Sequence, residues 1–277
     1  MAGTSGGRGV NLVPRLSPHA EATIHTFLRA HLAEAGAHGL VVGLSGGIDS
    51  ALCVRLAADA IGANRTHGLL LPDGAFPAAL RAEVEDYARG LGVGLDAVPI
   101  DGPEFSFRSL YPEVTDRVTW GNVKARIRMT ILYLWAREHH ALVVGTGNKS
   151  ELLMGYFTKW GDGGVDLLPI GDLYKTQVRE LAARLGLPRP ILDRPPTAGL
   201  WEGQTDEAEL GLPYAELDQI LYGFEQLRST EEIATATGIP VDRIRSVEAT
   251  MGGTRHKRRL PPIPKLGLRT VGIDWRE

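Results

Sequence analysis

Cysteine is almost absent from this sequence, in which Cys53 is the only one among 277 residues. A single cysteine excludes an internal disulfide, a zinc site of four cysteines and a redox pair. A chain without disulfides is typical of the cytosol, and we expect a cytoplasmic protein. Cys53 lies in a stretch rich in alanine and leucine, where we expect it to be a small buried hydrophobe.

The sequence also lacks an excess of charge of one sign and any long apolar run. Its formal net charge is -3, which gives no general attraction to nucleic acid or to a membrane surface. No stretch approaches the roughly 18 apolar residues of a membrane span, and residues 1–9 lack the apolar core of a signal peptide. We therefore expect no nucleic-acid or membrane partner, and a polyanionic ligand would have to meet local clusters of lysine and arginine.

Short apolar runs alternate with longer segments of helical pattern through the first half of the chain. This alternation predicts an α/β fold, a doubly wound parallel sheet with helices on both faces. We expect residues 1–16 to be a flexible leader, and residues 17–277 to be one domain with a helical C-terminal extension. The expected strands and helices of the first half occupy residues 17–36, 40–42, 50–61, 67–71, 78–90, 95–100, 119–139 and 141–144.

The loop after the first predicted strand has the residues of a phosphate site. Successive glycines turn backbone N–H groups inward and allow a ligand to come close, and the following helix adds partial positive charge. Two serine hydroxyls can donate to phosphate oxygens. Asp49 suits an anion site only if a divalent cation lies between it and the phosphates, an arrangement that Mg²⁺ favours. The alternative is a tight turn capped by Asp49 or Ser50. The loop comprises Gly43, Leu44, Ser45, Gly46, Gly47, Ile48, Asp49 and Ser50.

This loop is not a Walker loop, because it has no Gly-x-x-x-x-Gly-Lys-Ser/Thr. It resembles the Ser-Gly-Gly-x-Asp-Ser signature of the PP-loop ATP pyrophosphatases, which cleave ATP between the α and β phosphates. That class contains amidating enzymes and tRNA-modifying enzymes. A thiolating member usually needs a second cysteine, which this chain does not have.

Several further motifs, in order along the chain, closely resemble the NAD synthetase family. They occupy residues 122–129, 144–151, 155–166, 171–177, 195–207 and 256–258. The resemblance implies a doubly wound, five-stranded sheet of the adenine nucleotide alpha hydrolase-like kind and a homodimer. It also implies ATP-dependent amidation of deamido-NAD to NAD by ammonia, through an adenylated intermediate. Some relatives carry an N-terminal glutaminase domain, and the short leader here leads us to expect the ammonia-dependent form.

The resemblance also assigns roles to individual residues. It implies that Asp49 and Glu151 hold Mg²⁺, and that Thr146, Lys175 and Thr197 bind ATP together with the loop at residues 43–50. No protein nucleophile or general base is assigned. Deamido-NAD would be bound by Arg126, Lys159, Asp166, His256 and Lys257.

Each role has a plainer alternative that the residues alone leave open. Thr146 can be a helix N-cap, Lys175 a solvated lysine on a helix, and Arg126 an arginine whose stem covers an apolar helix face. Lys159 and Asp166 can form a loop ion pair of little energetic weight. The capping box at residues 229–232 and the helical pattern after it also fit a helix-turn-helix, so a DNA-binding module is a remote alternative.

Overall fold

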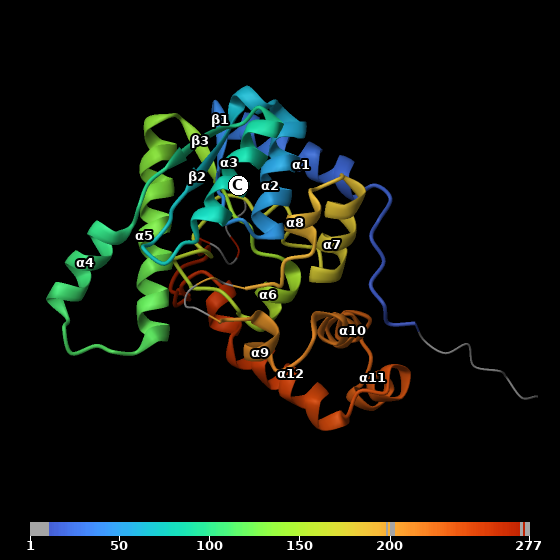
Figure 1. Cartoon of the computed structure of the whole chain (residues 1–277). Coiled ribbons are helices and arrows are strands. Elements are labelled where there is room, and N and C mark those ends of the chain that lie inside the picture. Colours follow the sequence, from blue (N-terminus) through green and yellow to red (C-terminus); the bar gives the residue numbers. More distant parts are fainter. Residues whose placement is uncertain (1–10, 198, 200–202, 272–273, 275–277) are drawn as a thin grey trace, which may run out of the picture.

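The structure, a computed structural model, describes residues 11–197, 199, 203–271 and 274. Its helices and strands alternate through the first half of the chain, and helices alone make up the second half (Figure 1). In chain order the elements are α1 (Ala20–Glu34), β1 (Gly39–Gly43), α2 (Ile48–Ile61), η1 (Ala63–Arg65), β2 (Thr66–Leu70), α3 (Ala78–Leu91), β3 (Gly94–Ala97), α4 (Asp101–Leu110), α5 (Arg117–Glu138), β4 (Ala141–Val144), α6 (Lys149–Met154), α7 (Lys175–Arg184), α8 (Arg189–Leu192), α9 (Asp206–Leu210), α10 (Tyr214–Glu225), α11 (Thr230–Thr237), α12 (Val241–Gly253) and η2 (Arg255–Arg258).

Among the described residues the sheet has four strands in the order β3-β2-β1-β4, and every neighbouring pair is parallel. The chain moves from β1 to β2 and β3 in one direction, and then returns to place β4 on the other side of β1. The strand order therefore reverses between β1 and β4. In open parallel sheets this reversal leaves a crevice at the carboxyl ends of the two strands, where ligands bind.

The expected fifth strand is wrong for the described residues. Only a single parallel bridge, between Val144 and Leu167, lies beyond β4. Pro169 follows closely and has no N–H to donate to a ladder, so pairing cannot continue past Leu168. The segment is therefore an extended stretch held by three backbone bonds, among them Gly145 N to Leu167 O at 2.7 Å.

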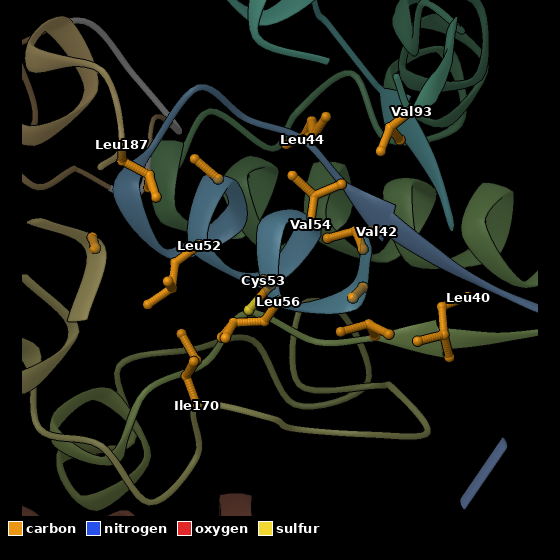
Figure 2. Packing of buried hydrophobic residues seen from close by; sticks show 14 of the residues in the cluster. Leu40, Val42, Leu44, Leu52, Cys53, Val54, Leu56, Val93, Ile170 and Leu187 are labelled. Carbon is orange, nitrogen blue, oxygen red and sulfur yellow. The ribbon is translucent and has the colours of Figure 1, made fainter. Parts of the chain in front are cut away.

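Helices cover both faces of the sheet, as predicted. Side chains alternate along β1, so that Leu40 and Val42 pack against α1, α2, α3 and α7, while Val41 packs against α5 on the opposite face. Helix α2 is buried over most of its surface, and Cys53 lies within it at 0% exposure beside Leu56 (Figure 2). The interpretation of Cys53 as a small buried hydrophobe is confirmed.

The last three helices form a layer of their own, at the bottom of Figure 1. A second apolar cluster joins α10, α11 and α12 to Met154 of α6 and to Tyr174. Leu12, which belongs to the expected leader, is buried in the same cluster. Residues 1–10 lie outside the described part of the chain.

Two short helices lie between α7 and the C-terminal layer. Helix α8 has Pro190 in its first turn. Helix α9 is capped by the Thr205 side chain. None of the described helices is long and apolar enough to cross a membrane.

Gly155, which ends α6, positions that helix against the C-terminal segment. It has a left-handed backbone with φ +66°, and Lys257 Nζ donates to its carbonyl. A Cβ at this position would lie 2.8 Å from Thr254 Cγ2 and Oγ1. Only glycine allows this backbone conformation and this close approach together.

We expect Gly155→Ala to lower the free energy of unfolding by about 2 to 5 kcal/mol. About 1 to 2 kcal/mol comes from the left-handed backbone and about 1 to 3 kcal/mol from the overlap with Thr254. Gly186→Ala is the matched control, because Gly186 has φ +72° and nothing within 4 Å of its added Cβ. Urea unfolding measures both variants, and equal losses would contradict the close approach.

Candidate active site

The two loops that the sequence singles out meet where the strand order reverses. The loop of residues 43–50 leaves the carboxyl end of β1, and residues 145–151 leave the carboxyl end of β4. Because β1 and β4 are hydrogen-bonded neighbours, the loops lie side by side. This places Asp49, near the start of α2, close to Glu151, near the start of α6.

The loop after β1 turns sharply and leaves the start of α2 open. Gly46 has φ +83°, and a Cβ there would lie 2.6 Å from Leu80 Cδ1. Ser50 Oγ donates to Gly47 O and lies 3.2 Å from Ser45 Oγ. Gly47 is the N-cap and provides no side-chain cap, so neither Asp49 nor Ser50 caps the helix. The first N–H groups of α2 therefore have no intrahelical partner, an arrangement suited to phosphate oxygens.

A buried lysine joins the two carboxylates. Lys175 Nζ lies 2.5 Å from Asp49 Oδ2 and 3.3 Å from Glu151 Oε1, and the lysine side chain is 2% exposed. The structure thus brings Lys175 together with Asp49 and Glu151, and its predicted role in binding ATP stays a prediction. The alternative of a solvated lysine does not agree with the geometry.

Asn148 fixes both carboxylates, and the sequence analysis gave it no role. Its Nδ2 donates to Asp49 Oδ1 at 3.0 Å, and its backbone N–H donates to Glu151 Oε2 at 3.1 Å. Glu151 N donates back to Asn148 Oδ1, which completes a capping box at the start of α6. Asn148, not Thr146, is therefore the N-cap. The box motif Asn-x-x-Glu is the signal in the sequence that could have identified it.

Carboxyl groups outnumber cationic side chains at this centre. Burial opposes a charge on Lys175, but Asp49 and Glu151 outweigh it, and the pKa of Lys175 is raised. Burial raises the pKa of Glu151, against the effect of Lys175. The neighbouring Asp206 is 3% exposed, and burial raises its pKa as well. One lysine thus faces three carboxyl groups.

A divalent cation fits this donor set. Asp206 Oδ1 is buried without a hydrogen-bond partner, and its Oδ2 accepts from the Tyr214 hydroxyl at 3.2 Å. Within the described ranges no three His, Cys, Asp or Glu side chains converge closely enough to hold a metal by themselves. Mg²⁺ is commonly bound by one or two carboxylates together with substrate phosphates and water. The carboxylates of Asp49 and Glu151, beside a loop suited to phosphate, match this coordination preference of Mg²⁺.

Asp218, to which the sequence analysis also gave no role, helps to position the backbone at Lys175. Asp218 of α10 is fully buried and accepts from Ser150 Oγ at 2.5 Å and from Thr176 N at 2.8 Å. Ser150 Oγ in turn accepts from Lys175 N at 3.0 Å. These bonds occupy N–H groups in the first turn of α7, which the helix itself leaves unpaired. An aspartate on the buried face of an amphipathic helix was the available signal.

Thr146 and Thr197, both predicted to bind ATP, differ in their surroundings. Thr146 is half-buried just beyond β4, whereas Thr197 is exposed and accepts from Gly199 N at 3.1 Å. Among the described residues, Thr197 forms no hydrogen bond with the loop after β1. Arg194 instead donates to the Gly46 carbonyl and to Glu83 Oε2, at 2.5 Å for the latter, and so ties the loop to α3.

Four of the five residues assigned to deamido-NAD form one basic cluster. Lys159 Nζ donates to the carbonyls of His256 and Arg259, at 2.8 and 3.1 Å. Arg126 donates to Lys159 O at 3.3 Å. Lys257 bonds Gly155 O, as described above. Residues from α5, from the loop after α6 and from η2 therefore converge at the C-terminal end of α6.

Asp166 lies apart from that cluster and forms no ion pair with Lys159. Its Oδ1 accepts from the Tyr133 hydroxyl at 2.9 Å, and its Oδ2 accepts from Val143 N at 2.8 Å. The alternative of an exposed loop ion pair between Lys159 and Asp166 is therefore wrong. Asp166 instead ties the segment beside β4 to the sheet and to α5.

Known proteins match this chain over most of its length. A family model described as NAD synthase matches residues 21–261. An NH3-dependent NAD+ synthetase of Methanosarcina acetivorans is 46% identical over 250 residues, which cover 89% of this chain and 98% of that protein. Another, of Hyperthermus butylicus, is 45% identical over 244 residues, with 87% and 88% covered.

Solved structures agree with these relatives. An NMN synthetase of Francisella tularensis has a TM-score of 0.80 at 33% identity, covering 91% of this chain and 100% of that one. An NH3-dependent NAD synthetase of Campylobacter jejuni has a TM-score of 0.76 at 28% identity, covering 89% and 97%. With the family model and these relatives in agreement, the chain belongs to the NAD synthase family.

Proposed function

We propose that this protein converts deamido-NAD to NAD with ATP and ammonia, releasing AMP and pyrophosphate. The observation that carries the proposal is the meeting of a phosphate-type loop with a buried carboxylate pair where the strand order reverses. The curated relatives, named NH3-dependent NAD+ synthetases, support the reaction. They do not support the alternatives of a tRNA-modifying enzyme or a DNA-binding module. In α11 and α12, moreover, Ile233 and Ile244 are fully buried against α10, as in an ordinary helix pair.

The residues of the loop and of the carboxylate pair act on ATP. The open N–H groups of α2, with Ser45 and Ser50, receive phosphate oxygens, and Asp49 and Glu151 hold Mg²⁺. When bound, Mg²⁺ draws off the negative charge that develops as pyrophosphate leaves. The nicotinate carboxylate attacks the α-phosphorus, so no protein nucleophile is needed. Ammonia then attacks the activated carbonyl carbon, and AMP leaves.

The basic cluster at the C-terminal end of α6 acts on deamido-NAD. Arg126, Lys159 and Lys257 bring three cationic side chains to a half-exposed surface, where a dinucleotide pyrophosphate can pair with them. All three groups donate to backbone carbonyls, and phosphate oxygens of the ligand would compete with those carbonyls for the same donors. Holding both substrates in fixed geometry can contribute about 7 to 11 kcal/mol to lowering the barrier.

The ammonia-dependent form is favoured by the names of the relatives. The matching proteins of Methanosarcina acetivorans and Methanosarcina mazei, 46% and 45% identical to this chain, are both named NH3-dependent NAD+ synthetases. The composition, with one buried cysteine, favours the cytoplasm as the place of action.

Incubation of the protein with ATP, Mg²⁺, deamido-NAD and ammonium is expected to yield NAD and AMP in equal amounts. Glutamine in place of ammonium is expected to yield neither. A parallel reaction with nicotinate mononucleotide is warranted by the match to an NMN synthetase. Chromatography of the nucleotides measures all products. NAD absent with both nitrogen donors would sink the proposal, and turnover of the mononucleotide alone would replace the dinucleotide as substrate.

Asp49→Asn is expected to lower kcat/KM by about 100-fold or more, because the variant loses a charged metal ligand. Asp59→Asn is the matched control on the same helix, since Asp59 pairs only with Arg55 on the surface in its described ion pairs. Steady-state AMP release measures both. Near-normal activity of Asp49→Asn would refute its role in binding the metal.

We also propose a homodimer formed through α4 and α5. Helix α4 projects from the body in Figure 1, and its Phe105 and Leu110 are 72% and 69% exposed. On α5, Leu134 is 64% exposed. Exposed apolar side chains on α4 and α5, two helices that contact each other, are available for such an interface.

Light scattering is expected to give about twice the chain mass of 29.9 kDa. Phe105→Glu combined with Leu110→Glu is expected to shift the protein to the monomer. Leu227→Glu is the control, because Leu227 is 92% exposed on the C-terminal layer, away from α4. A monomeric wild-type protein would contradict the proposed dimer.

A further inference from the structure

The ammonium group of Lys175 occupies the space between the two proposed metal ligands. It lies 2.5 Å from Asp49 Oδ2 and 3.3 Å from Glu151 Oε1, with the Tyr214 ring centroid 5.3 Å away. The side chain is 2% exposed, so water contributes little to stabilising its charge. The two carboxylates and the ring are the partners of this cation.

The carboxylate oxygens that Lys175 holds are the ones that a metal would need. Asp49 Oδ1 and Glu151 Oε2 are both occupied by Asn148, at 3.0 and 3.1 Å. The oxygens left free of Asn148 are Asp49 Oδ2 and Glu151 Oε1. A divalent cation held by both residues through these oxygens would need the space that the Lys175 ammonium occupies.

The carboxylates do not depend on Lys175 for their position. Asn148 orients Asp49 and Glu151 through its amide and through the capping box of α6. The backbone of Lys175 is held separately, by Ser150 Oγ and by the first turn of α7. The lysine has a long, flexible stem on a fixed backbone, and its ammonium can move while the carboxylates stay in place.

We infer that Lys175 is an internal counter-ion that holds the metal position in the nucleotide-free protein, and that the divalent cation enters together with ATP. With nucleotide bound, the Lys175 ammonium would pair with the phosphates of ATP, and Asp49 and Glu151 would be free to hold Mg²⁺. This inference rests on the proposed function. The inference predicts an order of binding. A metal ion without nucleotide has to compete with the Lys175 ammonium, whereas bound ATP offers that ammonium its phosphates as a new partner.

Titration with Mn²⁺ in the absence of nucleotide, followed by electron paramagnetic resonance, tests the inference without any measurement of activity. Lys175→Met is expected to bind Mn²⁺ about tenfold or more tightly than the wild type, because the competing charge is gone. Lys149→Met is the matched control. Lys149 is another partly buried lysine with two acidic partners, Asp172 and Glu225, outside the carboxylate pair. It is expected to leave the Mn²⁺ affinity unchanged.

Further variants keep the result specific. Adding Asp49→Asn to Lys175→Met is expected to abolish the gain in affinity. Lys175→Gln, which keeps a polar group in the site, is expected to show the same gain and serves if the methionine variant does not fold. If the wild-type protein binds Mn²⁺ without nucleotide as tightly as Lys175→Met or Lys175→Gln does, the inference is overturned. This comparison needs only one of the two variants to fold.

The outcomes also separate this inference from the proposed function. A wild-type complex of protein, Mn²⁺ and ATP, with no gain in either lysine variant, would overturn the counter-ion role and leave the proposed metal site standing. Absence of that ternary complex in the wild type would overturn the metal site itself, and the counter-ion role with it.

Discussion

The amide of Asn148 connects the two halves of the candidate active site. It joins Asp49, which follows β1, to Glu151, which follows β4, and these strands are far apart in the sequence but adjacent in the sheet. Without this bridge, the two buried carboxylates would be held together only by the flexible side chain of Lys175. A fully buried asparagine is costly unless its bonds are made, and here they are made to both halves. The hydrogen bonds of Asn148 therefore fix the two loops relative to each other and orient the two carboxylates at the same time.

The cost of that arrangement is an excess of buried negative charge. A lysine paired with two carboxylates repays only part of the desolvation of three acidic groups. A protein built for stability alone would fill this space with apolar side chains, as it does around Cys53 one turn further along α2. The persistence of Asp206 with an unsatisfied oxygen indicates that the centre is shaped for a cationic ligand.

The sequence was sufficient to predict the parts of the site that are local in the chain. The glycine-rich turn and Asp49 follow a β-branched run directly, so these residues alone indicated a phosphate loop. Glu151 and Lys175 were assigned only through the resemblance to the family. The residues alone could not show that Lys175 is buried, because Ser150 and Asp218 of α10, far along the chain, position it. The fifth strand was expected from the resemblance to the family, and Pro169 limits it to a single bridge. Asp166 was predicted by motif alone, and its two oxygens are taken by Tyr133 and Val143.

The short helix α6 links the two substrate regions. Its N-terminal end carries Glu151 and the capping box, and beyond its C-terminal end Gly155 accepts from Lys257 of the basic cluster. Six helical residues span only about 9 Å, with no hinge between them. The groups proposed for ATP and for deamido-NAD are thus set at a nearly fixed separation, whatever the surrounding loops do. Because Gly155 allows Thr254 to pack against this junction, a change that shifts η2 also shifts the basic cluster relative to the carboxylate pair. The alignment of two phosphate-bearing substrates therefore depends on packing at a glycine that touches neither.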